Sequence, residues 1–143
     1  MSLKIRPEQL EAFQPVADAA FAARLAKYLR ANHADAVVRI SSGAVAVARL
    51  PEATLTKIVR SGMSRARGYG LTSESSLAAF IVLMFLAAPN FDAHPLIQRV
   101  LQDKDSEPDN RINNLWARVS PQNWKAVYGY YDTGAWSLDE GGP

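Results

Sequence analysis

Apolar residues recur at helical spacing through the first thirty positions of the chain. These positions are Leu10, Phe13, Val16, Phe21, Leu25, Tyr28 and Leu29. Pro7 precedes them and suits the first turn of a helix, where its missing N–H leaves no bond unmade. The pattern predicts one long first helix, with a bend at Pro15 because proline removes a backbone hydrogen bond there.

The helical pattern weakens between residues 34 and 50. Three β-branched residues precede a Ser-Ser-Gly turn signal, and two valines then alternate with small residues. The residues concerned are Val37, Val38, Ile40, Ser41, Ser42, Gly43, Val45 and Val47. Segment 36–49 is therefore expected to form either a short β-hairpin or a loop, and the sequence leaves both open.

A clear amphipathic pattern follows over residues 51–69. Its apolar stripe contains Leu55, Ile58, Val59, Met63, Ala66 and Tyr69. The opposite face carries the cations Lys57, Arg60 and Arg67, as expected of a helix with one side in water. Gly62 falls inside the apolar stripe, where a missing side chain lets a neighbouring backbone approach. The sequence therefore predicts a helix crossing at Gly62.

The next segment, residues 73–88, has almost no polar face. Thr72 or Ser73 can cap its start, and Glu74 is well placed near the positive end of the helix dipole. A helix that is apolar all round must be surrounded by neighbours. We therefore expect residues 77–88 to be buried on nearly all sides, as the central helix of the domain.

Three shorter helices are expected near Pro95, Pro108 and Pro121, because each proline precedes apolar residues at helical spacing. Ser120 is the expected N-cap of the last one. With the preceding elements, the pattern predicts an all-α fold of five or six helices around the helix at 73–88.

Length and composition support a single compact domain over residues 1–136. The chain has 143 residues, of which 48% are hydrophobic and 21% charged, as is ordinary for one globular domain. Residues 137–143 form a short acidic, glycine-rich tail that is expected to be disordered.

Cysteine content and the lengths of apolar runs bear on the cellular compartment. The sequence has no cysteine, which excludes disulfides, thiolate nucleophiles and cysteine-ligated zinc. Charged residues interrupt the first thirteen positions, so no secretory signal is expected. The longest apolar run, residues 77–88, falls short of the ~20 residues needed to cross a bilayer. The sequence therefore predicts a cytoplasmic protein.

Charge is distributed unevenly along the chain. Residues 1–70 carry eleven Lys or Arg against five acids, a net charge of +6, whereas residues 71–143 carry five against nine, a net of −4. The cations Arg49, Lys57, Arg60, Arg65 and Arg67 could contact nucleic-acid phosphates without sequence specificity. An ordinary solvated surface explains the same pattern.

The sequence offers little catalytic chemistry. His33 and His94 each lie two residues from an aspartate, but no spacing typical of a metal site or catalytic triad is present. The acidic residues Asp103, Asp105, Glu107 and Asp109 lie in a hydrophilic connector that is more typical of a solvated loop than of a glycosidase cleft. We therefore predict no enzymatic activity, no cofactor and no metal site.

Aromatic residues are concentrated near the C-terminus, where six of the thirteen lie between Trp116 and Trp136. Tryptophan and tyrosine often anchor protein interfaces. Helix-like spacing assigns Trp116, Trp124 and Tyr128 to the core. The remaining three, beyond the expected end of the last helix, are predicted to contact a partner: Tyr130, Tyr131 and Trp136. Packing of all six onto the core is the alternative.

Several segments together resemble a known family. They are Ile5-Arg6-Pro7-Glu8-Gln9-Leu10, the run from Gly62 to Glu74 containing Arg65-Ala66-Arg67-Gly68-Tyr69-Gly70, Leu83-Met84-Phe85, and Phe91-Asp92. The chain resembles small, uncharacterised helical proteins of Gram-negative bacteria that are encoded beside PAAR-repeat spike proteins and effectors of type VI secretion systems. The likeness runs with gaps from about Ile5 to Trp124 and departs at Val37 to Ala48, which is longer and more apolar here.

The resemblance implies an accessory role beside a secreted toxin, as an adaptor, a chaperone-like factor or an immunity protein. It brings no catalytic residues with it. The leading hypothesis is thus a non-catalytic protein-binding accessory factor whose partner is a secreted effector or spike component. Lys57, Arg60 and Arg67 would add an electrostatic contact. The alternative is a nonspecific nucleic-acid-binding protein that uses the basic face of helix 51–69, and homo-oligomerisation stays open.

Overall fold

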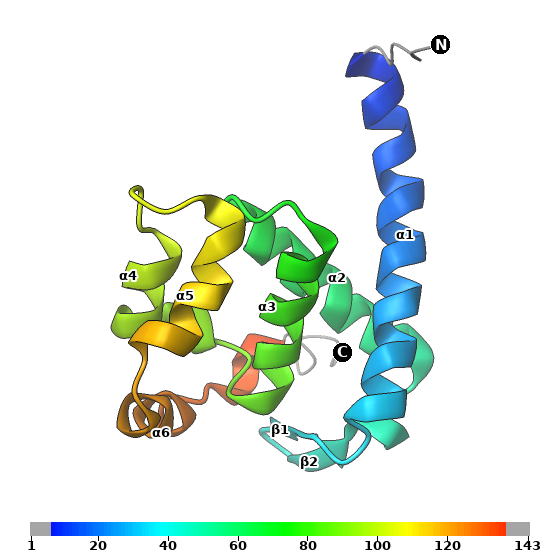
Figure 1. Cartoon of the computed structure of the whole chain (residues 1–143). Coiled ribbons are helices and arrows are strands. Elements are labelled where there is room, and N and C mark those ends of the chain that lie inside the picture. The colour runs from blue at the N-terminus through cyan, green and yellow to red at the C-terminus, as the bar shows by residue number, and fades with distance from the viewer. Residues whose placement is uncertain (1–6, 137–143) are drawn as a thin grey trace.

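The computed structural model describes the backbone of residues 7–136 and the side chains of residues 18–136. This part of the chain contains six α-helices and one two-stranded sheet (Figure 1). In order these are α1 (Pro7–Asn32), β1 (Val37–Ile40), β2 (Gly43–Ala46), α2 (Glu52–Gly68), α3 (Glu74–Leu86), α4 (Pro95–Leu101), α5 (Arg111–Arg118) and α6 (Pro121–Gly129). The predicted, mainly helical architecture is confirmed. The expected disorder of residues 137–143 lies outside the described residues.

Helix α1 is much longer than the others and continues without a break through Pro15, where a bend was expected. Its C-terminal half packs against α2 and buries Ala22, Leu25, Ala26 and Leu29. Its N-terminal turns extend beyond the rest of the molecule (Figure 1). Only part of α1 therefore belongs to the helical bundle.

Segment 36–49, which the sequence left open, forms a β-hairpin. The strands β1 and β2 pair in antiparallel register from Val37 opposite Ala46 to Ile40 opposite Gly43, which leaves a two-residue turn. Val38 is fully buried, whereas Val37 is exposed, because successive strand residues face opposite sides. The hairpin thus uses one face to cover the core.

Helices α2 and α3 cross at Gly62, as the sequence predicted. A Cβ atom on Gly62 would lie 2.6 Å from Sδ of Met84 and 2.9 Å from Cγ1 of Ile81. These distances are shorter than van der Waals contact, so the missing side chain is what lets the two helices approach.

The turn between α2 and α3 depends on Gly70. The N–H of Gly70 donates to the carbonyl of Arg67 (2.9 Å), and the N–H of Leu71 donates to the carbonyl of Ala66 (3.2 Å). Gly70 has φ +91°, a left-handed conformation that favours glycine. The buried Leu71 completes this helix-ending motif, and Ser73 then caps α3 by accepting the N–H of Ser76.

Helix α3 contributes more large buried side chains than any other described element. Leu77, Phe80, Ile81, Leu83, Met84 and Phe85 are all buried. The expectation that it would be enclosed on nearly all sides is wrong, however, because Leu86 is 48% exposed and Ala78, Ala79 and Val82 are half-buried. One side of α3 is left without a covering helix, and it faces a surface depression described below.

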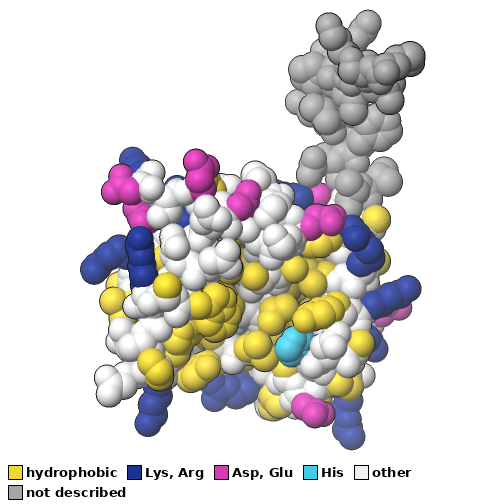
Figure 2. Space-filling model, in the orientation of Figure 1, with side chains coloured by type: hydrophobic (Ala, Val, Ile, Leu, Met, Phe, Trp, Pro, Cys, Tyr) yellow, Lys and Arg dark blue, Asp and Glu magenta, His cyan; other side chains and the backbone are white. Residues whose placement is uncertain are grey.

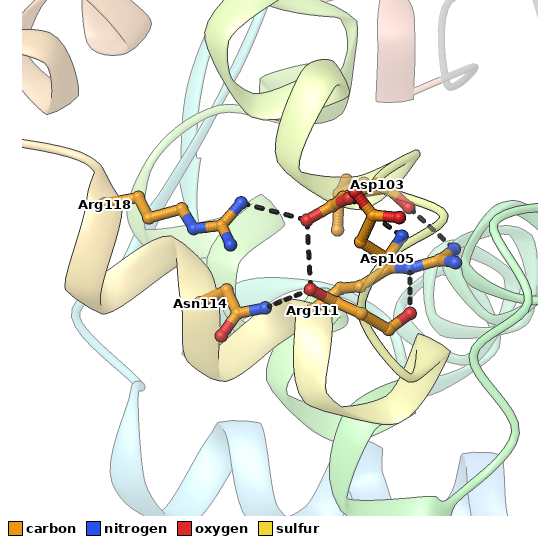
Figure 3. Close-up of polar contacts among 7 residues, drawn as sticks. Asp103, Asp105, Arg111, Asn114 and Arg118 are labelled. Carbon is orange, nitrogen blue, oxygen red and sulfur yellow. Dashed lines mark hydrogen bonds and ion pairs between the residues drawn. The ribbon is translucent and has the colours of Figure 1, made fainter.

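A polar network joins the acidic connector after α4 to helix α5 (Figure 3). Asp103 accepts hydrogen bonds from Ser106 Oγ and Arg118, each 3.0 Å long. Asn114 donates to Ser106 Oγ (3.1 Å), and one Arg111 nitrogen donates to the carbonyl of Leu101 (3.0 Å). The backbone N–H of Asp105 also donates to Asp103 (3.0 Å). This bond is the main cause that lowers the pKa of Asp103, followed by the bonds from Ser106 and Arg118. The connector is therefore an exposed loop, as expected, that these bonds tie to α5.

Among the described residues, no helix combines the length and the hydropathy that crossing a membrane requires.

Candidate protein-binding surface

Two tryptophans from neighbouring helices lie side by side at the surface. Trp116 on α5 is 59% exposed, and Trp124 on α6 is half-buried. Their ring centroids are 5.5 Å apart with 32° between the planes. Helix α5 presents Ile112 and Leu115 to the core. Trp116 lies at the edge of the same stripe, about 100° around the helix from Leu115, where packing leaves it uncovered.

These rings border a shallow apolar hollow between α3, α5 and α6, which we call the aromatic hollow. It is lined by Leu83, Leu86, Ala87, Trp116, Val119, Pro121, Trp124 and Tyr128. None of the lining residues is charged, and Tyr128 (47%) and Leu86 (48%) are exposed together with Trp116. Single exposed apolar residues are common, but a contiguous group of large ones marks an interaction surface.

A second apolar depression, the α1–α3 groove, adjoins the aromatic hollow. It is lined by Phe21, Arg24, Leu25, Tyr28, Ala78, Ala79, Val82, Leu83, Leu86 and Trp116. Leu83, Leu86 and Trp116 belong to both depressions. Figure 2 shows apolar side chains gathered across this face of the molecule, with charged side chains mainly around its margin.

Two of the residues predicted to contact a partner are instead tied into the fold. Trp136 is only 3% exposed, its ring lies 5.0 Å from that of Phe85, and its Nε1–H donates to Tyr131 Oη (2.8 Å). Tyr131 is half-buried, accepts the backbone N–H of Arg39 (2.9 Å) and lies beneath the Arg39 guanidinium. The surface assignment of Trp136 is therefore wrong, because the chain after α6 turns back to cover α3 and β1.

Tyr130, the third predicted contact, is 47% exposed and meets His94 edge-on, with ring centroids 5.2 Å apart. It is not among the residues that line the aromatic hollow or the α1–α3 groove. The structure thus separates it from the main apolar face.

The assignment of Trp116 and Tyr128 to the core is also wrong. Sequence spacing places Trp116 on the same stripe as Ile112 and Leu115, but the helices packed against α5 cover only part of that stripe. The concentration of aromatics after position 115 correctly indicated the region. No sequence signal distinguishes the exposed Leu86 from the buried leucines of α3.

The basic face of α2 is weaker than the sequence suggested. Both terminal nitrogens of Arg67 donate to Asp18, at 2.8 and 2.6 Å, and these bonds are the main cause that raises the pKa of Arg67. Lys57 and Arg60 are exposed and make no ion pair with a described residue. Two exposed cations and one paired cation make a poor phosphate-binding surface.

Asp92 is the one buried charged residue among those described. It forms an ion pair with Arg65 and accepts the hydroxyl hydrogen of Tyr69 at 3.0 Å. Burial, followed by the charge of Asp92, raises the pKa of Tyr69. Arg65 is therefore engaged with Asp92, which weakens its candidacy as a phosphate contact. The cluster of Asp92, Arg65 and Tyr69 ties α2 to the segment before α4.

His94 accepts the N–H of Leu96 through Nδ1 (3.2 Å) and so caps α4 directly before Pro95. Within residues 18–136, no three His, Asp or Glu side chains gather closely enough to hold a metal ion.

Comparisons with protein-family models, with curated proteins and with solved structures found nothing that matches this chain.

Proposed function

We propose that this chain is a non-catalytic protein-binding accessory factor that docks a partner protein on the aromatic hollow. One observation carries the proposal: Leu86, Trp116 and Tyr128 are all about half-exposed or more around a hollow with no charged lining residue. A folded chain that leaves these side chains in water gains stability when another protein covers them.

The energetics of interfaces support this choice of site. A specific interface buries about 800 Å² per partner and draws most of its binding energy from a few desolvated anchors, often tryptophan or tyrosine. The paired rings of Trp116 and Trp124 have few rotamers to freeze, so their entropy loss on binding is small. Four large side chains around one hollow therefore provide a plausible energetic centre for an interface.

The resemblance to proteins encoded beside type VI secretion spikes and effectors suggests the identity of the partner. An adaptor or chaperone-like factor binds the non-toxic loading region of an effector, whereas an immunity protein binds and silences its toxic domain. In either role, the chain meets its partner in the cytoplasm of the producing cell. Measuring which part of the effector is bound separates the two roles.

The test is co-expression of the full chain with the effector or spike protein encoded beside it, followed by calorimetric titration of the purified partners. Trp116→Ala and Tyr128→Ala should each raise the dissociation constant at least tenfold, about 1.4 kcal/mol. Tyr130→Ala is the matched control, because Tyr130 and Tyr128 are equally exposed, at 47%. The control should bind like the unchanged chain.

Equal weakening by all three variants would place the interface elsewhere. If the adjacent genes encode neither an effector nor a spike component, the secretion-system part of the proposal fails, whatever the hollow binds.

A further inference from the structure

Helix α6 is weakly anchored to the bundle. Among its nine residues, all of them described, Val127 alone is buried, whereas the shorter α4 buries three of its seven. No hydrogen bond joins residues 121–129 to a described residue outside 120–131. At about 2.5 turns, the helix is too short to be stable in water without tertiary contacts. Apart from Val127 and the half-buried Trp124, α6 therefore depends on the segment that follows it.

Residues 130–136, which we call the C-terminal strap, return from α6 toward α3 and β1 (Figure 1). Asn90, just beyond α3, holds the strap from two directions. Its Nδ2–H donates to the carbonyl of Tyr130 (3.0 Å), and its Oδ1 accepts the N–H of Asp132 (3.0 Å). One side-chain amide therefore uses both of its ends to fix the strap beside the end of α3.

The far end of the strap carries a buried anchor. Trp136 is buried against Phe85, and the Tyr131 hydroxyl accepts both the Nε1–H of Trp136 (2.8 Å) and the backbone N–H of Arg39 on β1 (2.9 Å). Trp136 is one of two buried residues between 120 and 136. Three exposed hydrogen bonds join this stretch to the rest of the described chain. Two buried anchors and three exposed bonds are few attachments for a stretch of this length.

Helix α6 and the strap are joined by backbone hydrogen bonds. The N–H of Tyr130 donates to the carbonyl of Val127 (3.0 Å), and the N–H of Tyr131 donates to the carbonyl of Tyr128 (3.4 Å). These bonds connect the last turn of α6 to the first residues of the strap. The two segments therefore move together more readily than apart.

The rest of the bundle has attachments of its own. The crossing of α2 and α3 at Gly62 and the bonds of Arg111 to the ends of α2 and α4 involve no residue of 120–136. Proteins open first where buried apolar contacts are few and hydrogen bonds are exposed. Residues 120–136 have both properties, whereas α3 is rich in buried side chains.

We propose that residues 120–136 open and close as one unit, which we call the C-terminal unit, while the other helices stay folded. Closure completes the aromatic hollow, because Pro121, Trp124 and Tyr128 line it from this unit and the other lining residues all precede residue 120. Asn90 and Trp136 line no part of the hollow, so they are positioning residues that act on it through α6. This role in binding rests on the proposed function, whereas the opening itself does not.

Native-state hydrogen exchange at low urea, followed by NMR, tests the opening without any partner. Amides 124–131 should share one opening equilibrium and be at least tenfold less protected than amides 81–85 at the centre of α3. Gly62→Ala weakens the crossing of α2 and α3, which stays intact when the C-terminal unit opens. It should therefore lower the protection of amides 81–85 and leave that of amides 124–131 unchanged. Equal losses in both would overturn the proposal, since α6 would then open only with the whole chain.

Asn90→Ala tests the strap itself, because it removes both side-chain bonds to the strap and no residue that lines the hollow. The protection of amides 124–131 should fall at least threefold, by one common factor. Asn32→Ala is the matched control: it removes an exposed amide bond at the end of α1, to the carbonyl of Tyr28 (3.1 Å), and should leave amides 124–131 unchanged. A loss confined to amides 130–132 would contradict the proposal, because the strap would then fray without α6.

The role of closure in binding is tested on the complex with the co-expressed partner. Binding should raise the protection of amides 124–131 at least tenfold, because the partner contacts Trp116 outside the C-terminal unit and Tyr128 inside it. A bound partner without such a rise would overturn the role of closure and leave the opening itself intact. If no protein binds the hollow, the proposed function fails, and exchange in the free chain still decides whether the unit opens. The two failures are therefore distinguishable.

Discussion

The face formed by α1, α3, α5 and α6 differs sharply from the side formed by α2, α4 and the acidic connector. On the first, Tyr28, Leu86 and Trp116 are left in contact with water. On the second, two acidic side chains are fixed by partners: Asp92 by Arg65 and Tyr69, and Asp109 by the start of α3.

The polar side shows how the chain stabilises its own irregular segments. A single Arg111 nitrogen donates to the carbonyls of Tyr69 and Leu101, both at 3.0 Å, and so satisfies the ends of α2 and α4 together. Such bonds replace those that helix ends cannot make internally. The apolar face has no comparable internal role for its exposed rings. Changes on the polar side should therefore affect folding, and changes on the apolar face should affect association.

The largest change in the free energy of unfolding is expected from a comparison of Trp136 with Trp116. The sequence analysis assigned Trp136 to the surface and Trp116 to the core, whereas the structure buries Trp136 and exposes Trp116. Trp136→Ala should lower the free energy of unfolding by about 3–5 kcal/mol, because it removes a buried ring and leaves a cavity beside Phe85. Trp116→Ala should lower it by less than about 1 kcal/mol, since most of that ring is already exposed. Urea denaturation measures both. Equal losses would remove the distinction between the two regions.

A smaller loss is expected when the buried ion pair is broken. Asp92→Ala leaves Arg65 without its carboxylate partner and the Tyr69 hydroxyl with only the longer bond to the carbonyl of residue 92 (3.3 Å), and it should lower stability by about 3 kcal/mol. Glu74→Ala breaks the exposed pair with Arg24 and should lower it by less than about 1 kcal/mol. Thermal or urea denaturation of the two variants gives the comparison, and an Asp92 variant as stable as the Glu74 variant would show that burial adds nothing to this pair.

A more moderate loss of stability is expected from a substitution at Gly62, where α2 and α3 cross. Gly62→Ala should destabilise by about 1–2 kcal/mol, because the added methyl group meets Met84 and Ile81. Gly68→Ala is the control: nothing lies within 4 Å of its Cβ position, so the change should be neutral or stabilise by up to about 1 kcal/mol. A stabilised Gly62 variant would mean that α3 shifts easily away from α2.

The subtlest effect is a change in acid stability. Backbone N–H donors of Thr72 and Ser73 lower the pKa of Asp109 from its ordinary 3.8 to about 2. Its ionised form therefore contributes stability above about pH 4, and this contribution is lost as the pH falls through about 2. Asp109→Asn should be less stable at neutral pH and should lose less stability between pH 4 and 2.

Urea midpoints across this pH range measure that effect. Asp105→Asn, at an exposed position in the same connector, should follow the unchanged chain. An Asp109→Asn curve parallel to that of the unchanged chain would show that this carboxylate does not cap α3 in solution.

Local rules were sufficient for most helix boundaries. Pro95 and Pro121 begin α4 and α6, and Ser73 and Ser120 cap α3 and α6, because a cap or a first-turn proline acts within one turn of the chain. The crossing at Gly62 could be predicted for a similar reason: a glycine inside an apolar stripe has a meaning that does not depend on the identity of its neighbour.

What the sequence by itself determined was therefore a mainly helical chain with an aromatic-rich C-terminal region and no evident catalytic motif. Only the tertiary structure decided which aromatics face water. Leu115 and Trp116 share one stripe of α5, but packing covers only the first. Trp136 lies outside any periodic pattern, yet the return of the chain beneath α3 buries it. Arg67 belongs to an exposed helix face in sequence, yet Asp18, forty-nine residues away, holds it. Helical periodicity fixes the direction of a side chain relative to its own helix, and exposure depends on whether a distant segment covers that direction.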